Sequence, residues 1–475
     1  MKKNVKISFL EYLGFEESKE LNDKWLQTTR MFGIKNSDLK KAMDEMLPKY
    51  WKMETPGVKD MLRAYMLELM DLTRVGEDNS EPVKSVYGVV PSIATSYYAL
   101  RNAAGQSSYV GYPYLIISTV FSSVLFKTNP FIGQAENDAG ISYGCKHCGL
   151  NKTRIGLNCK SVIRNPDVVW SWGHTCDEAP KTDEFIKSNC NKDWRYIVTR
   201  LPHDTHFGEK DDEIADRVEY VAASIKDGIA EIGKIIGVNV KEEHIWQAIK
   251  QERDFMEKID RLNSLVSMVG KADITGNELS LVSQPIHIPF STGLENIESS
   301  VDKMIGHLES VCKNGEEGEK RPKVGCYFVP FSVPWVAKMF EDKGVDLVFS
   351  TTLSMTDKQM EDMNIDNPYK QIAMDWLKMP LAVNGLNEAD MICQKIRRYK
   401  PDAMVFGLFS FDRWLGAHQK LMVNMVEKET GVPHFYIEGD IWDEKNFNSS
   451  NLETRIDSLC DFLKMNKIIS EIVIK

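Results

Sequence analysis

A chain of 475 residues is too long for a single compact core, so two or three domains are expected. Hydrophobic residues make up 43% and charged residues 27%, as in ordinary globular proteins. The formal net charge of −10 argues against nucleic acid as the main partner, because a protein that grips phosphates needs a basic face.

Neither an export signal nor a membrane span is indicated by the sequence. The N-terminus is briefly basic but has no sustained apolar run and no small-residue cleavage site. The most apolar stretch, residues 112–126, is shorter than the roughly 20 residues of a spanning helix and contains several serines. We therefore expect this stretch to be a buried core segment and the protein to be cytoplasmic.

Residues 1–80 are predicted to form a helical N-terminal region. The stretches 39–53 and 58–72 return apolar residues every three or four positions, which is the period of a helix that faces a core. Residues 76–82 mix turn-forming and charged residues, so the first domain boundary is expected there.

Residues 81–210 are predicted to form a first α/β domain. A buried strand at 167–172 is followed by a short helix at 178–187 and a second strand at 194–201. A strand, helix and strand of this size form a βαβ unit, which implies a parallel sheet covered by helices.

The helical period returns in residues 211–320, which are expected to link two α/β halves. Residues 321–475 then alternate apparent strands with helices, so they predict a second α/β domain; the strands are expected at 323–329, 345–350, 403–409 and 434–439. The predicted fold class is thus α/β, with two doubly wound parallel-sheet domains of the Rossmann or flavodoxin type. Such sheets bind ligands beyond the carboxyl ends of their strands.

The cysteines are unevenly distributed along the chain. Of nine in total, five lie close together in sequence, namely Cys145, Cys148, Cys159, Cys176 and Cys190. Without an export signal, thiols that bind metal are favoured over disulfides. Several thiolates converging on one point are what an iron–sulfur cluster requires.

Other interpretations of these cysteines stay open. A single Cys-x2-Cys pair is also found in zinc sites, although the second such pair of a zinc ribbon is missing. Cys159 and Cys190 are as well explained as small buried hydrophobic residues. His147 is more typical of a solvent-facing loop than of a ligand. Cys148 lies in an apparent glycine-flanked loop, and Cys176 directly follows a predicted strand.

Three passages resemble the 2-hydroxyacyl-CoA dehydratase and benzoyl-CoA reductase family, in particular its larger subunits. Cys148-Gly149, followed by Lys152, Thr153, Arg154 and Gly156, looks like the passage around the first cluster cysteine. Cys176-Asp177 after a strand looks like the second. The C-terminal passage is the most specific match, through Gly439, Asp440, Asp443, Phe447, Thr454 and Arg455.

The sequence departs from the family at the third cluster cysteine, where Phe411 stands. Phenylalanine cannot bind iron, so the resemblance implies either a lost cluster or a replacement ligand. Cys145 is the expected replacement in a [4Fe-4S] site with Cys148 and Cys176. Cys159 and Cys190 would extend the site to a larger cluster, as in double-cubane relatives.

The resemblance also implies a reaction. In this family an ATP-hydrolysing iron–sulfur activator protein delivers one low-potential electron to the catalytic protein, an anaerobic radical chemistry. The thioester carbonyl of a 2-hydroxyacyl-CoA becomes a ketyl radical anion, water is lost and the electron is recovered. His174 and Asp177, which flank Cys176, are candidate bases, and His203 and His206 are further candidates for the same cleft.

Partners and alternatives follow from the same resemblance. The expected partners are a related dehydratase subunit or a second copy of the chain, the activator protein and an acyl-CoA, with no nucleic acid and no membrane. A low-potential reductase of the benzoyl-CoA reductase or double-cubane type is the first alternative. A non-catalytic partner subunit and a zinc protein are the others.

Overall fold

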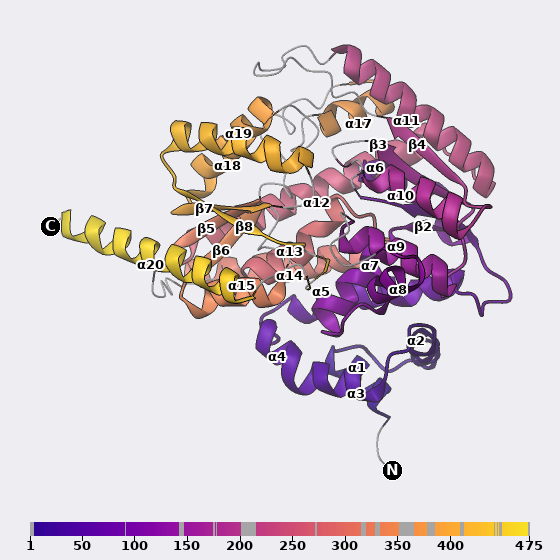
Figure 1. Ribbon diagram of the computed structural model, residues 1–475, viewed down its shortest axis with the longest axis horizontal. Helices are drawn as coiled ribbons and strands as arrows, with labels where there is room; N and C mark the ends of the chain where they lie inside the picture. Colours follow the sequence, from indigo (N-terminus) through magenta and orange to yellow (C-terminus); the bar gives the residue numbers. More distant parts are fainter. Residues whose placement is uncertain are drawn as a thin grey trace.

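Two parallel sheets, with helices around and between them, form the framework of the protein (Figure 1). The structure is a computed structural model. It describes residues 4–90, 92–141, 147–173, 176, 178–200, 215–270, 273–314, 320–327, 333–350, 365–377, 385–408, 413–440, 442–443, 445 and 449–473.

The N-terminal region is helical, as predicted. Its elements are α1 (Val5–Tyr12), α2 (Lys19–Met31), α3 (Asn36–Lys41), η1 (Ala42–Met46), α4 (Leu47–Tyr50), α5 (Val58–Asp71) and η2 (Leu72–Val75). Helix α5 is buried along most of its length and packs against the middle of the chain, whereas α4 packs against a helix of the second α/β half. This region therefore contacts both halves of the protein.

The first sheet has the strand order β2-β1-β3-β4, and all its pairs are parallel. Its strands are β1 (Lys84–Gly88), β2 (Ser108–Gly111), β3 (Val168–Gly173) and β4 (Tyr196–Arg200). The associated helices are α6 (Ala94–Ala104), η3 (Gly105–Ser107), α7 (Pro113–Thr119), η4 (Val120–Val124), α8 (Pro130–Asp138), α9 (Gly149–Lys160), α10 (Glu178–Phe185) and η5 (Ile186–Cys190). The predicted βαβ unit is β3, α10 and β4.

The apolar stretch 112–126 lies inside the protein. It forms α7 and η4, whose side chains are almost all buried, as expected for a core segment. Within the described residues, none of the helices combines the length and the apolar character needed to cross a membrane.

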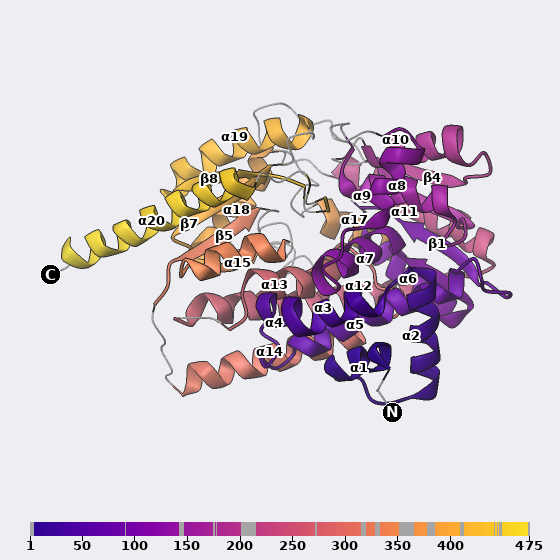
Figure 2. The same cartoon turned by 60° about the horizontal axis from the view of Figure 1, so that its bottom comes forward.

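Helices of the middle segment join the two halves. They are α11 (Ala215–Ile236), α12 (Glu242–Met268), α13 (Gly276–Ser283), η6 (Gln284–Ile286) and α14 (Glu295–Lys313). Helix α12 packs against α6 of the first half and against a strand and two helices of the second half. Figures 1 and 2 both place α12 between the two sheets.

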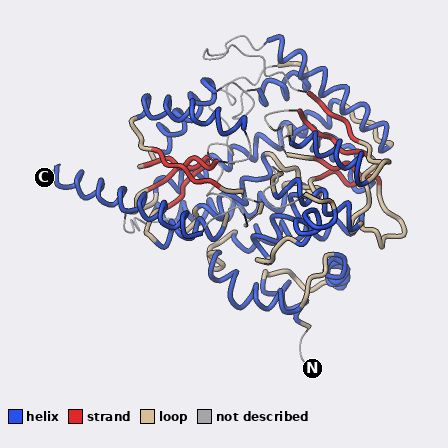
Figure 3. Tube along the Cα trace, in the orientation of Figure 1, coloured by secondary structure: helices blue, strands red, loops and turns tan. Residues whose placement is uncertain are grey.

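The second sheet repeats the topology of the first, with the order β6-β5-β7-β8 and parallel pairs throughout. Its strands are β5 (Lys323–Tyr327), β6 (Asp346–Ser350), β7 (Ala403–Leu408) and β8 (His434–Glu438). The helices are α15 (Pro334–Asp342), α17 (Pro368–Leu377), α18 (Gly385–Tyr399), α19 (Arg413–Thr430) and α20 (Ser449–Val473). Figure 3 shows the two sheets apart, each flanked by helices, which confirms the predicted α/β class.

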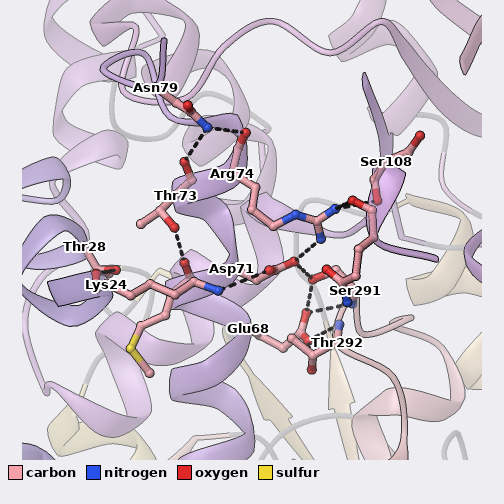
Figure 4. Close-up of polar contacts among 12 residues, drawn as sticks. Lys24, Thr28, Glu68, Asp71, Thr73, Arg74, Asn79, Ser108, Ser291 and Thr292 are labelled. Carbon is pink, nitrogen blue, oxygen red and sulfur yellow. Dashed lines mark hydrogen bonds and ion pairs between the residues drawn. The ribbon is translucent and has the colours of Figure 1, made fainter. Parts of the chain in front are cut away.

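A buried carboxylate fixes the N-terminal region to the middle segment (Figure 4). Glu68 on α5 has no exposed surface and accepts hydrogen bonds from the backbone amides of Ser291 (2.8 Å) and Thr292 (2.7 Å). Asp71, one turn later, accepts a bond from the Ser291 hydroxyl (2.9 Å) and pairs with Arg74 (3.0 Å). These bonds satisfy the carboxylates that would otherwise be costly to bury.

A second buried acid lies where α12 meets both halves. Glu252 accepts a hydrogen bond from Thr95 on α6, and the adjacent Arg253 forms an ion pair with Asp375 on α17 at 2.7 Å. Burial raises the pKa of Glu252 to about 8, and the nearby charge of Asp375 adds to the effect. The native protein therefore holds a proton that the unfolded chain releases at a pH of about 4.5.

Stability is expected to fall as the pH rises from about 4.5 to about 8, because the unfolded state binds fewer protons than the native state in that window. Glu252→Gln, neutral at every pH, should reduce this dependence and gain of the order of 5 kcal/mol over wild type above pH ~8. Urea unfolding across the pH range measures the effect. Glu257→Gln, at an exposed position of the same helix, should keep the wild-type profile. Parallel profiles for wild type and Glu252→Gln would contradict the assignment.

Candidate functional site

The site begins where α9 starts. Cys148 is the N-cap residue of α9 and is 7% exposed. The amide groups at a helix N-terminus need partners from outside the helix, and two carboxylates from distant parts of the chain supply them. Glu178 accepts a hydrogen bond from the Cys148 amide (3.1 Å), and Asp440 accepts one from the Gly149 amide (2.6 Å).

Cys148 and Cys176 lie close enough for their charges to interact. Cys176 is half-buried, follows β3 and precedes α10, so it stands at the carboxyl end of a sheet strand. Burial raises the pKa of the Cys148 thiol well above its usual range, and Glu178, Asp440 and Cys176 raise it further. Cys148 is thus a protonated thiol in the metal-free protein, and a thiophilic metal would displace that proton.

The segment after β8 closes over the start of α9. Asp440 has no exposed surface; besides the Gly149 amide it accepts a bond from the Trp442 amide (2.9 Å). Burial raises the pKa of Asp440 to about 7. Gly149 is needed for this approach, because a Cβ atom there would lie 2.6 Å from the carbonyl carbon of Trp442. Asp440 therefore connects the second α/β half to the helix that carries Cys148.

Replacing Gly149 with alanine tests this packing. Since the added methyl group meets backbone atoms, we expect the free energy of unfolding to fall by about 1–3 kcal/mol, as in other overpacked sites. Gly133→Ala in α8 is the matched control, because a Cβ atom there meets nothing within 4 Å. Urea unfolding of both variants gives the comparison. Equal loss of stability in the two variants would contradict the close approach.

A chain of charges extends the same contact. Lys152 on α9 is 1% exposed and pairs with Asp443 (3.3 Å) and with Glu136 on α8 (3.0 Å). Glu136 in turn pairs with Lys445 (2.6 Å). A buried lysine with two carboxylate partners keeps its charge, so α8, α9 and the segment after β8 are held together.

A fully buried ion pair joins α9 to α10. Arg154 and Asp183 have no exposed side-chain surface and are bonded to each other. Arg154 also donates to the Ala179 carbonyl (3.0 Å), and the Trp194 indole donates to Asp183 (3.0 Å). Because α9 begins at Cys148 and α10 begins just after Cys176, this pair fixes the relative position of the two cysteines.

A cavity of about 580 Å³ adjoins Asp440, within the usual range for small-molecule sites. Its walls come from the N-terminal helices, the first α/β half, α15 and the segment after β8. Aromatic side chains, two lysines and two aspartates line the cavity. They are Tyr50, Phe126, Lys127, Trp335, Asp440, Trp442, Asp443 and Lys445. Tyr50 stacks on Phe126 with ring centroids 5.1 Å apart.

Cys159 and Cys190 are not brought to Cys148. Cys159 is near the last residue of α9, about 16 Å along the helix from Cys148 at ~1.5 Å per residue. It lies instead near Cys190, the last residue of η5, an element that packs against α9. The two groups of thiols are therefore separate sites.

Several predicted residues lie outside the described part of the chain. They are Cys145, His174, Asp177, His203, His206, Phe411 and Phe447. Within the described residues, no group of three or more histidine, cysteine, aspartate or glutamate side chains is arranged to hold a metal ion.

One local prediction was wrong, and some contacts were missed. The glycine-flanked loop after Cys148 is helix α9, in which Gly156 allows close packing: a Cβ atom there would lie 1.9 Å from the Phe131 carbonyl oxygen. Sequence reasoning also missed Glu178 and Glu136. The position of Glu178 at a helix start after Cys176 is a weak signal, and nothing in the sequence points to Glu136.

Comparison with known proteins agrees with the family resemblance drawn from the sequence motifs. A sequence model of the family described as 2-hydroxyglutaryl-CoA dehydratase, D-component, matches residues 120–463, which include Cys148, Cys176 and Asp440. The (R)-2-hydroxyisocaproyl-CoA dehydratase alpha subunit of Clostridioides difficile is 20% identical over 372 residues, covering 73% of this chain and 86% of the relative. The (R)-phenyllactyl-CoA dehydratase alpha subunit of Clostridium sporogenes is 20% identical over 378 residues, covering 75% and 88%.

Proposed function

Since this chain belongs to the 2-hydroxyglutaryl-CoA dehydratase, D-component family, we propose that it is the iron–sulfur subunit of an ATP-activated, radical-type 2-hydroxyacyl-CoA dehydratase. The two curated relatives are alpha subunits of dehydratases that differ in their acyl group. The chain is accordingly a component of a dehydratase-type enzyme. Its partner in the proposal is a related subunit or a second copy.

The observation that carries the proposal is that the fold brings Cys148 and Cys176 close enough for their thiols to interact. Soft sulfur donors suit iron, and both stand where an α/β sheet presents its ligand site, one after β3 and one at the positive end of a helix. Cys145, three residues before Cys148, is the proposed third ligand. When bound, the cluster would supply one-electron chemistry and Lewis acidity for the leaving oxygen.

The protein's own groups have distinct tasks in this proposal. Glu178 and Asp440 orient the start of α9 by accepting its first amides. The segment after β8 packs against the start of α9 and helps to bury Cys148. His174 and Asp177, beside Cys176 in sequence, are the proposed groups that take the substrate proton.

The acyl-CoA is proposed to enter through the cavity next to Asp440. Its aromatic walls suit the carbon chain of an acyl group, and Lys127 and Lys445 suit the phosphates of coenzyme A. Lys445 is 43% exposed, so it faces the solvent side of the cavity, where a long ligand would leave the protein.

The test uses protein purified without oxygen, together with its activator, ATP and a strong reductant. A 2-hydroxyacyl-CoA should lose water without net consumption of reductant, whereas an acyl-CoA without the hydroxyl should not react. Stoichiometric consumption of reductant would show that the protein is a reductase and not a dehydratase. An iron content below about one atom per chain would favour the non-catalytic partner subunit. Zinc in place of iron and sulfide would identify a zinc protein.

A further inference from the structure

A second pair of thiols lies on the surface, at the other end of α9 from the proposed cluster site at Cys148. Cys159 is exposed near the end of α9, and Cys190 is half-buried at the end of η5. The two elements pack against each other, and the Cys159 and Cys190 thiols are close enough to affect each other's pKa. Neither forms a disulfide in this structure.

The pair has what a reversible disulfide needs. The two sulfurs are neighbours, they come from separate elements, and Cys159 is open to a soluble reagent. Cys312 on α14 offers the opposite case within the same chain, since it is exposed but has no such thiol neighbour among the described residues. Proximity, and not exposure alone, thus distinguishes Cys159 and Cys190.

We propose that Cys159 and Cys190 are a redox-active surface dithiol that closes to a disulfide by exchange with a small-molecule disulfide. The thiolate of one cysteine attacks a sulfur of the reagent, forms a mixed disulfide and releases one thiol. The second cysteine then attacks the sulfur of the first cysteine in the mixed disulfide. This step forms the protein disulfide and releases the second thiol of the reagent. The protein loses two protons and two electrons, and the reagent takes them up to become two thiols.

The surroundings set the rate of this exchange. Burial raises the pKa of Cys190 to about 11, with the neighbouring Cys159 contributing, and burial also raises the pKa of Cys159. Asp138, at the end of α8, is the charged group that faces Cys159, and it acts in the same direction. Since the thiolate is the attacking species, closure is slow near neutral pH and accelerates as the pH rises.

The experiment treats the full-length, anaerobically purified protein with oxidised glutathione, blocks the remaining thiols with N-ethylmaleimide and maps the peptides by mass spectrometry. The expected product is one peptide pair joined through Cys159 and Cys190. Cys312 should instead carry glutathione or maleimide. Dithiothreitol should restore both thiols, and the iron content should not change, because the pair lies at the far end of α9 from Cys148.

Variants separate the pair from other thiols. Cys312→Ser should give the same joined peptides as wild type, whereas Cys159→Ser and Cys190→Ser should not. Recovery of Cys159 and Cys190 as separately blocked residues, in a sample whose Cys312 has reacted with glutathione, would overturn the proposal. So would a disulfide that joins Cys190 to any cysteine other than Cys159.

Discussion

Serine in place of Cys148 is expected to abolish dehydration and to remove most of the bound iron. A hydroxyl is a harder and far less acidic donor than a thiol, so it does not replace a thiolate on iron. Even residues that only orient a metal ligand contribute about 10–100-fold, so loss of a ligand should lower turnover by more than about 100-fold. Iron, sulfide and turnover with activator and ATP are the measurements.

Two further cysteine variants make this result interpretable. Cys312→Ser removes an exposed thiol on α14 and should leave iron and turnover unchanged. Cys159→Ser should also retain iron, because Cys159 faces Cys190 at the other end of α9. Normal iron content in Cys148→Ser would exclude Cys148 as a ligand. Iron loss in Cys159→Ser would instead point to the larger cluster considered from the sequence.

Asparagine in place of Asp183 is expected to cause the largest loss of stability. The change leaves the Arg154 guanidinium buried without its counter-charge. Breaking a buried ion pair in this way costs about 3–5 kcal/mol, although the intact pair itself adds little. Because the pair joins α9 to α10, the loss falls on the elements that hold Cys148 and Cys176. Urea unfolding at constant pH measures it.

An exposed ion pair provides the control for Asp183→Asn. Lys250 and Asp254 form an i,i+4 pair on α12, with side chains 76% and 49% exposed. Asp254→Asn should cost no more than about 0.5 kcal/mol, since solvent screens such pairs. Comparable losses in the two aspartate variants would show that burial of the Arg154 charge does not set the cost.

Elements with a strong sequence period were predicted closely. The helical period of residues 211–320 corresponds to long helices such as Ala215–Ile236 and Glu242–Met268, and all four predicted strands of the second sheet are present. In the first half, β1 and β2 are five and four residues long and were not singled out.

The family resemblance drawn from short motifs is confirmed, yet the sequence could not supply the geometry of the site. The contact of Asp440 with Gly149 spans 291 residues of chain. Only the folded arrangement of the two sheets brings those residues together. Sequence distance misleads in the other direction as well: Cys159 is near Cys148 in sequence, but an unbroken helix holds the two apart. The ligand roles of Cys145, Cys148 and Cys176 stay predictions.

One wall of the cavity next to Asp440 lies outside the residues that match the family model. Met46 and Tyr50 line it from the N-terminal helices, which precede the residues 120–463 shared with the family. That wall contributes no group that holds the start of α9, so its shape can change without disturbing the thiols. Under the proposed function, substrate choice and electron chemistry would fall to different stretches of the chain. A chimera that carries the N-terminal helices of another dehydratase would be the direct route to a new acyl preference.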